Sequence, residues 1–152
     1  MSISPGDRAP DFTLPSTKGA ITLSELLAKG KVVLAFYFQD DTPLCATQVG
    51  MLKGDFDLLS ELGAQVVAIS ADDLDSHRRF DERLGGLPFP LASDPSLAVA
   101  RAYGVVDETG KRCRRAMFVI DQDGTVLLAN PFFQPNSPQQ YQELFRALGL
   151  EV

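Results

Sequence analysis

The sequence predicts an α/β protein with a mixed central β-sheet flanked by helices, and three patterns support this fold class. Two short runs rich in β-branched and aromatic residues, 32–38 and 65–70, are typical of strands buried on both faces. A longer segment with apolar residues at helical spacing separates them, as in a strand–helix–strand unit. Two later apolar runs flank the turn Gln122-Asp123-Gly124, which indicates an antiparallel β-hairpin.

Ahead of the first buried strand, the chain predicts a small hairpin and a short helix. Residues 9–23 contain two short extended runs around a Ser-Thr-Lys-Gly turn, which is typical of an N-terminal β-hairpin. Residues 24–29, which end at Gly30, predict a single helical turn or a short helix. The buried strand 32–38 then follows.

The segment after this strand predicts one helix from about Pro43 to Leu62, ended by Gly63. Within it, Gly50 and Gly54 each destabilise a helix by roughly 1 kcal/mol relative to alanine. We therefore expect a helix that unwinds more easily than its length suggests.

The remainder of the chain alternates between helical and extended patterns. In order, these are a helix over 74–84, an extended edge or loop piece over 87–91, a helix ending at Gly104, strands over 115–121 and 125–129, and a helix over 138–148. The chain shows no internal repeat and no linker composition, so we expect a single domain over residues 1–152.

Composition narrows the class of partner. The net charge of −6 argues against nucleic acid and anionic membrane surfaces, and no apolar run is long enough to cross a bilayer. The first residues have neither a basic nor an apolar region, so we expect no signal peptide. Two cysteines do not make a disulfide framework in a chain of 152 residues, which favours a cytoplasmic location.

Cys45 is the strongest candidate for chemistry. It follows the buried strand 32–38, and Thr42 and Pro43 are typical of the N-cap and first position of the next helix. Backbone N–H groups and the positive end of the helix dipole favour thiolate over thiol in the first turn. We expect the sulfur to be ionised and open to solvent at the carboxyl end of the central strand.

Other titratable residues carry less signal. His77, the only histidine, lies on a polar helix and is expected at the surface. Asp40 and Asp41 are typical of a solvated turn before an N-cap. Without a cluster of histidines and cysteines, we expect neither a metal nor another cofactor.

The order and spacing of several motifs resemble the peroxiredoxin family, in particular its bacterioferritin comigratory protein (peroxiredoxin Q) branch. The motifs are Pro10–Leu14, Asp40–Cys45, Ala68–Ser70, Leu87–Leu91 followed by Ser93–Pro95, Ala102–Val105 and Arg115–Asp121. The resemblance implies a thioredoxin-like fold and a peroxidase that reduces hydrogen peroxide and organic hydroperoxides. It also implies that Cys45 becomes a sulfenic acid and that a thiol donor, a thioredoxin-like protein or a small thiol, restores it.

The same resemblance assigns two residues that act with this cysteine. Thr42 corresponds to the threonine that hydrogen-bonds the thiolate and the peroxide, and Arg115 to the arginine that holds the thiolate from a distant strand. Donors of this kind stabilise the charge that develops on the departing oxygen. We expect that the reaction needs no cofactor. We expect the chain to be a monomer or a homodimer.

Two positions depart from the family pattern. Phe38 stands where the family has a proline that shields the thiolate, and Gly50 stands where this branch often has a resolving cysteine. The second thiol is Cys113, two residues before Arg115 and on the same strand face if the strand has begun there. Cys113 is therefore a possible resolving cysteine for Cys45. The alternative is that an external thiol or a redox protein reduces Cys45. The simplest interpretation of Cys113 itself is an inert thiol.

Two other functions remain open at this point. Because of Phe38, the chain is alternatively a weakened peroxiredoxin-like redox sensor or interaction protein. A disulfide reductase is disfavoured because such enzymes carry Cys-x-x-Cys, and Gln48 occupies the second position. Gln48 stands where relatives often have glutamate, and we expect a surface residue there.

Overall fold

The computed structural model describes residues 3–150, so the four terminal residues of the expected 1–152 domain lie outside the described part. A five-stranded sheet in the order β5-β4-β3-β6-β7 forms its centre. The strands are β1 (Thr13–Leu14), β2 (Ile21–Thr22), β3 (Lys31–Phe36), β4 (Ala64–Ser70), β5 (Leu91–Ser93), β6 (Ala116–Ile120) and β7 (Val126–Asn130). β3 runs parallel to β4 and antiparallel to β6, which confirms the mixed sheet.

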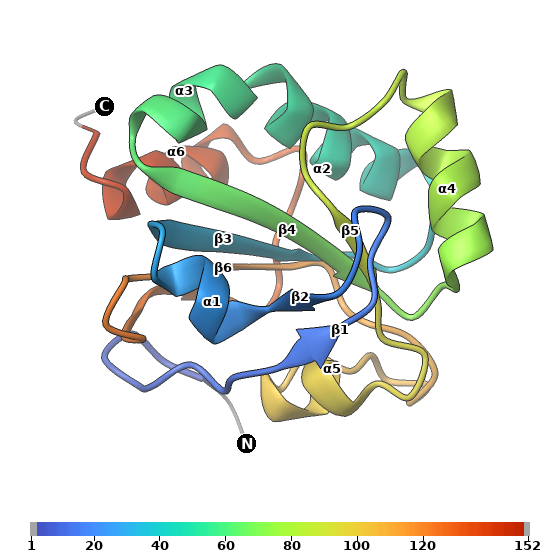
Figure 1. Ribbon diagram of the computed structural model, residues 1–152, viewed down its shortest axis with the longest axis horizontal. Helices are drawn as coiled ribbons and strands as arrows, with labels where there is room; N and C mark the ends of the chain where they lie inside the picture. Colours follow the sequence, from blue (N-terminus) through green and yellow to red (C-terminus); the bar gives the residue numbers. More distant parts are fainter. Residues whose placement is uncertain (1–2, 151–152) are drawn as a thin grey trace.

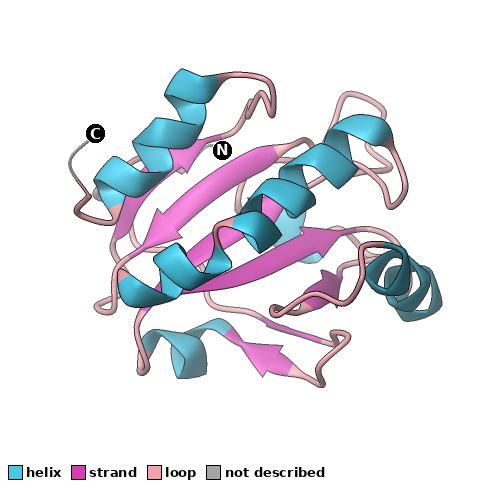
Figure 2. Cartoon of the chain, turned by 90° about the horizontal axis from the view of Figure 1, so that it is seen from above, coloured by secondary structure: helices cyan, strands magenta, loops and turns pink. Residues whose placement is uncertain are grey.

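Helices cover both faces of this sheet (Figure 1). They are α1 (Leu23–Leu27), α2 (Pro43–Gly54), α3 (Phe56–Glu61), α4 (Leu74–Arg83), α5 (Ala98–Ala102) and α6 (Pro138–Ala147). In the view of Figure 1, α2, α3, α4 and α6 lie above the sheet, and α1, α5 and the β1–β2 hairpin lie below it. Figure 2 shows the upper helices from above, lying over the strands. None of the helices within residues 3–150 has the length and apolar character needed to cross a membrane.

The alternation of side chains along the strands creates two hydrophobic cores. Odd-numbered residues of β3 and β6, such as Val33 and Met117, pack against the upper helices in what we call the upper core. Even-numbered residues, such as Leu34 and Phe118, pack against α1, α5 and the hairpin in the lower core. The parity of a residue on β3 or β6 therefore states which face of the sheet its side chain joins.

The N-terminal hairpin is confirmed. β1 and β2 pair antiparallel, with Thr13 opposite Thr22 and Leu14 opposite Ile21. Leu14 is buried in the lower core, so the hairpin closes the underside of the sheet.

Two boundaries differ from the prediction. The single helix expected over 43–62 is broken at Asp55, where the backbone leaves helical geometry (φ −102°, ψ 12°). The hydroxyl of Tyr141 on α6 donates to the Asp55 carboxylate at 2.7 Å, a long-range contact at the break that no local pattern reveals. In addition, β3 ends at Phe36 rather than at residue 38, so Tyr37 and Phe38 begin the loop to α2.

Candidate active site

Cys45 lies in the first turn of α2, next to the carboxyl end of the central strand β3, as expected. Its side chain is fully buried in the upper core, so the expectation that the sulfur is open to solvent is wrong for this conformation. The loop that follows β3 packs over it, and the backbone N–H of Phe38 donates to Cys45 Sγ at 3.3 Å. The sulfur thus has a hydrogen-bond donor whose position is fixed by the backbone.

Thr42 occupies the N-cap position of α2 with extended backbone angles (φ −81°, ψ 143°), and Pro43 follows at the first helical position. Its hydroxyl does not cap the helix. Instead it donates to the backbone carbonyl of Gln39 at 2.8 Å, and only the Thr42 carbonyl joins the helix, as acceptor of the Ala46 N–H. The N–H groups of the first turn near Cys45 thus have no side-chain cap, which leaves the positive end of the helix dipole uncompensated.

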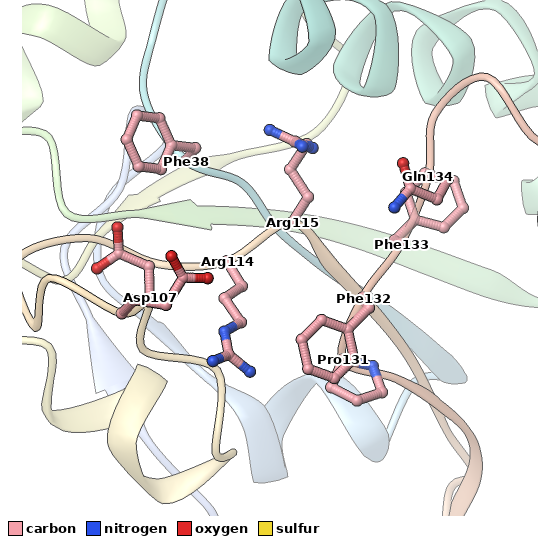
Figure 3. Close-up of a pocket in the computed structure, with 9 residues that line it drawn as sticks. Phe38, Asp107, Arg114, Arg115, Pro131, Phe132, Phe133 and Gln134 are labelled. Carbon is pink, nitrogen blue, oxygen red and sulfur yellow. The ribbon is translucent and has the colours of Figure 1, made fainter.

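Arg115 precedes β6 by one residue and has the parity of the upper core. Figure 3 shows its guanidinium pointing toward α2, whereas the neighbouring Arg114 points the opposite way. Arg115 Nε is buried without a hydrogen-bond partner among residues 3–150. The carbonyl of Arg115 accepts the N–H of Phe133 at 2.9 Å, which fixes the backbone here. Arg115 therefore approaches the helix that carries Cys45, with donor capacity to spare.

Gln48, one helical turn after Cys45, is buried rather than at the surface. Its side-chain amide donates to the carbonyl of Phe36 at 3.1 Å and so ties α2 to the end of β3. The other end of the amide, Oε1, has no partner within the described residues. The amide ties the start of α2 to the strand end that precedes the cysteine loop.

A cavity of about 270 Å³ opens beside this region. Phe38 and Arg115, which line it, connect it to the cysteine loop and to β6, and its outer wall includes Phe132 (Figure 3). The Phe132 ring is 58% exposed, and the Arg114 guanidinium lies 4.6 Å from its centroid. The cavity therefore lies next to Phe38, whose N–H contacts the buried sulfur, and next to Arg115.

A buried polar network anchors the loop between β3 and α2. Asp40 accepts hydrogen bonds from the hydroxyl of Tyr37 at 2.6 Å and of Ser76 at 2.7 Å, and it lies 2.8 Å from Nδ1 of His77. Burial by itself raises the pKa of Asp40, but the hydrogen bonds from His77 and Tyr37 outweigh it and hold that pKa below its usual value. The carboxylate is therefore ionised at neutral pH, although the residue is buried.

The expectations that His77 is at the surface and that Asp40 belongs to a solvated turn are both wrong. His77 is fully buried, and its Nε2 lies 3.0 Å from the carbonyl of Ala92 on β5. One signal in the sequence pointed to this: His77 stands three residues before Phe80, which shares its buried helix face. Asp72 completes the cluster by accepting the N–H of Asp40 at 2.9 Å.

The composition of this cluster also raises the question of a metal. Asp40, Asp72 and His77 each bring a possible ligand atom within 4.8 Å of the others. These atoms already have partners in the protein, since Asp72 also pairs with Arg112 at 3.0 Å and with the Ser70 hydroxyl at 2.7 Å. The arrangement is a self-contained hydrogen-bond network.

Cys113 lies on the other side of the sheet. It precedes β6, which begins at Ala116, and packs in the lower core, whereas Cys45 packs in the upper core. Both cysteines are free thiols. Burial raises the pKa of Cys113 to about 12. The structure thus separates the two thiols by the sheet itself.

Comparison with known proteins identifies the family. Residues 5–129 match the family model described as AhpC/TSA family. The chain belongs to the AhpC/TSA family. It is 38% identical over 132 residues to a protein named putative peroxiredoxin bcp from Coxiella burnetii, a match that covers 83% of this chain and 87% of that relative.

Other members of the family agree in sequence and in structure. A peroxiredoxin Q of rice chloroplasts (Oryza sativa subsp. japonica) is 38% identical over 137 residues; the match covers 88% of this chain but only 62% of the longer rice protein. The crystal structure of peroxidoxin BcpB from Mycobacterium tuberculosis superposes with a TM-score of 0.85 at 30% identity and covers 99% of both chains. The thioredoxin-like fold and the peroxiredoxin assignment are confirmed, and the chain is a thiol-dependent peroxidase of this family.

Proposed function

We propose that Cys45 is the peroxidatic cysteine and that Thr42 and Arg115 act with it to reduce hydrogen peroxide and small organic hydroperoxides. One observation supports this most strongly. Cys45 lies at the start of α2, and Arg115 extends toward the same helix from the same face of the sheet with an unpartnered Nε. A thiolate and an uncommitted guanidinium on the same face of the sheet are the groups that an anion site requires.

The chemistry follows from these positions. The Cys45 thiolate attacks the terminal peroxide oxygen, a sulfur–oxygen bond forms, and the oxygen–oxygen bond breaks. The departing oxygen carries the negative charge and takes a proton from water, which leaves an alcohol or water and a sulfenic acid on Cys45. Arg115 stabilises the departing oxygen, and the Thr42 hydroxyl turns from the Gln39 carbonyl to the bound peroxide.

We assign the return step to an external thiol. Cys113 packs in the lower core and stays protonated at neutral pH because burial raises its pKa to about 12. A thiolate from a thioredoxin-like protein or a small thiol attacks the sulfenic sulfur and releases water, and a second thiol then reduces the mixed disulfide. For an internal disulfide, Cys45 would have to leave the upper core or Cys113 the lower core, because the sheet separates them.

Compartment and partners are part of the same proposal. Two free thiols suit a reducing compartment, and we propose the cytoplasm for this single-domain chain. The net charge of −6 supports a protein that binds neither nucleic acid nor anionic membranes. The partners that remain are the hydroperoxide and the thiol reductant.

Peroxide consumption in the presence of dithiothreitol tests the assignment. We expect the wild type and Cys113→Ser to consume peroxide at the same rate and Cys45→Ser to show only the background rate. Equal loss of activity in Cys113→Ser would contradict external recycling. Oxidation of Cys45 in the wild type without turnover would contradict the peroxidase and indicate a redox sensor instead.

A further inference from the structure

Among residues 3–150, the sulfur of Cys45 accepts one hydrogen bond, and it comes from the protein backbone. The Phe38 N–H donates to Cys45 Sγ at 3.3 Å, seven residues earlier in the chain. We propose that this N–H is a catalytic hydrogen-bond donor, which holds the Cys45 thiolate in the resting enzyme. The inference rests on the proposed function, because it requires Cys45 to react as the thiolate.

The position of this N–H follows from where β3 stops. Tyr37, the first residue after β3, still bonds to the neighbouring strand β4, from its N–H to the carbonyl of Ile69 at 3.0 Å. The next N–H, that of Phe38, leaves the sheet and turns toward α2, where Cys45 is its partner. No bond between strands is given up to make it.

Hydrogen bonds of Asp40 fix the loop that contains Phe38. Asp40 accepts the hydroxyl of Tyr37, the residue before Phe38, and donates its own N–H to Asp72 on the far side. Both the Tyr37 side chain and the Cys45 side chain are fully buried. A donor whose position is fixed by the fold interacts with a charge more strongly than a mobile donor in solution does.

The chemical consequence depends on where the charge lies. A thiolate is a much stronger acceptor than a thiol, so the Phe38 N–H increases the fraction of Cys45 that is ionised. During attack, Cys45–S⁻ and HO–OR become Cys45–SOH and RO⁻, which then takes a proton, so negative charge leaves the sulfur as the oxygen–oxygen bond breaks. The N–H therefore stabilises the resting thiolate more than the transition state.

This imbalance predicts an effect whose sign depends on pH. If the donor changes the acid dissociation of Cys45 about tenfold, the nucleophilicity of each thiolate falls about threefold, since the Brønsted coefficient of thiolates is about 0.4–0.5. The net gain is then about threefold at a pH where most of the thiol is protonated, and it becomes a loss of about threefold where all of it is ionised. Proline has no N–H and cannot supply this donor.

Two substitutions separate the N–H from the ring. Phe38→Pro removes both, whereas Phe38→Leu keeps the N–H and removes the ring. We expect the thiolate absorbance of Cys45 at 240 nm to titrate about one pH unit higher in Phe38→Pro and at the wild-type pH in Phe38→Leu. We also expect the peroxide rate of Phe38→Pro to cross that of Phe38→Leu, slower by about threefold at low pH and faster by about threefold at high pH. Equal midpoints in the two variants would overturn the proposal.

A measurement on the unaltered backbone guards against misfolding of the proline variant. In a ¹H–¹⁵N NMR titration, we expect the Phe38 amide proton to move with the same midpoint as the 240 nm absorbance, and this movement to vanish in Cys45→Ser. A Phe38 amide that ignores the ionisation of Cys45 would overturn the inference while leaving the peroxidase intact. A wild type that fails to react with peroxide would instead contradict the proposed function itself.

Discussion

The two cysteines of this protein are equally buried and differ in almost everything else. Cys45 lies above the sheet, at the start of a helix, with a backbone donor on its sulfur and Arg115 directed to the same helix. Cys113 lies below the sheet, where burial raises its pKa to about 12. Burial alone raises the pKa of a thiol, as at Cys113, whereas the backbone donor and the Arg115 guanidinium are the features that we propose make Cys45 the nucleophile.

The largest effect should come from the guanidinium of Arg115, which is directed toward the helix that carries Cys45. We expect Arg115→Gln to slow the reduction of hydrogen peroxide by about a thousandfold, because it removes a donor to the departing oxygen. Arg114→Gln is the matched control, since Arg114 is adjacent but points the other way, and it should stay within about threefold of the wild type. Stopped-flow rates for the two variants decide the assignment, and similar losses in both would contradict it.

The next effect concerns the loop that serves Cys45 alone. Asp40→Asn leaves part of a buried network unpaired, so we expect the free energy of unfolding at pH 7 to fall by about 3 kcal/mol. Because the pKa of Asp40 is lowered in the folded state, its carboxylate stabilises the fold above about pH 4, and the deficit of the variant should shrink below that pH.

Asp41→Asn provides the control for this measurement. Asp41 forms a half-exposed ion pair with Arg83, and its positive φ of 64° is one that asparagine tolerates. We expect a change of less than about 1 kcal/mol from this surface pair. Urea unfolding of both variants at pH 7 and at about pH 3 compares them, and equal losses would show that the buried network contributes nothing special.

A smaller effect is expected from the hydroxyl of Thr42. Thr42→Val should slow peroxide reduction by about tenfold to a hundredfold, while Thr42→Ser, which keeps the hydroxyl, should retain most of the rate. Because the Thr42 side chain does not cap α2, helix stability should change little in either variant. A serine variant as slow as the valine variant would argue for a packing role of the methyl group instead.

The smallest effect is expected from Cys113, on the pH dependence of the free energy of unfolding. The pKa of Cys113 is about 12 in the folded state, against 9.0 for an ordinary cysteine, so the thiol stays protonated when folded and ionises when unfolded above pH 9. Its contribution to stability is therefore complete below pH 9 and is lost as the pH rises toward 12. Relative to Cys113→Ala, the wild type should lose about 1.4 kcal/mol of unfolding free energy per pH unit above 9. Denaturation curves at pH 8, 9 and 10 test this, and parallel trends would contradict it.

Most of the fold was predictable because its signals are local. The β-branched and aromatic runs that became β3 and β4 report their own burial, and the Gln122-Asp123-Gly124 turn predicts the β6–β7 hairpin. At the helix break, the weak helix propensity of Gly54 is visible in the sequence, but the contact of Asp55 with Tyr141 is not, because it joins residues 86 positions apart.

In the candidate site too, features with a local sequence signal were predicted and those that depend on distant contacts were not. Cys45, Thr42 and Arg115 were expected from motifs, and the structure places Cys45 and Arg115 on one face of the sheet. The burial of His77 and Gln48 escaped prediction because each binds a backbone carbonyl of a strand elsewhere in the chain. Such partners depend on how elements pack, which a single sequence does not report.

One experiment compares the two thiols within the same molecule. Reduced wild-type protein is mixed with less than one equivalent of hydrogen peroxide in the presence of dimedone, which traps sulfenic acids, and the labelled peptides are quantified by mass spectrometry. We predict label on Cys45 and none on Cys113. Label on Cys113, or label shared evenly between the two cysteines, would contradict it.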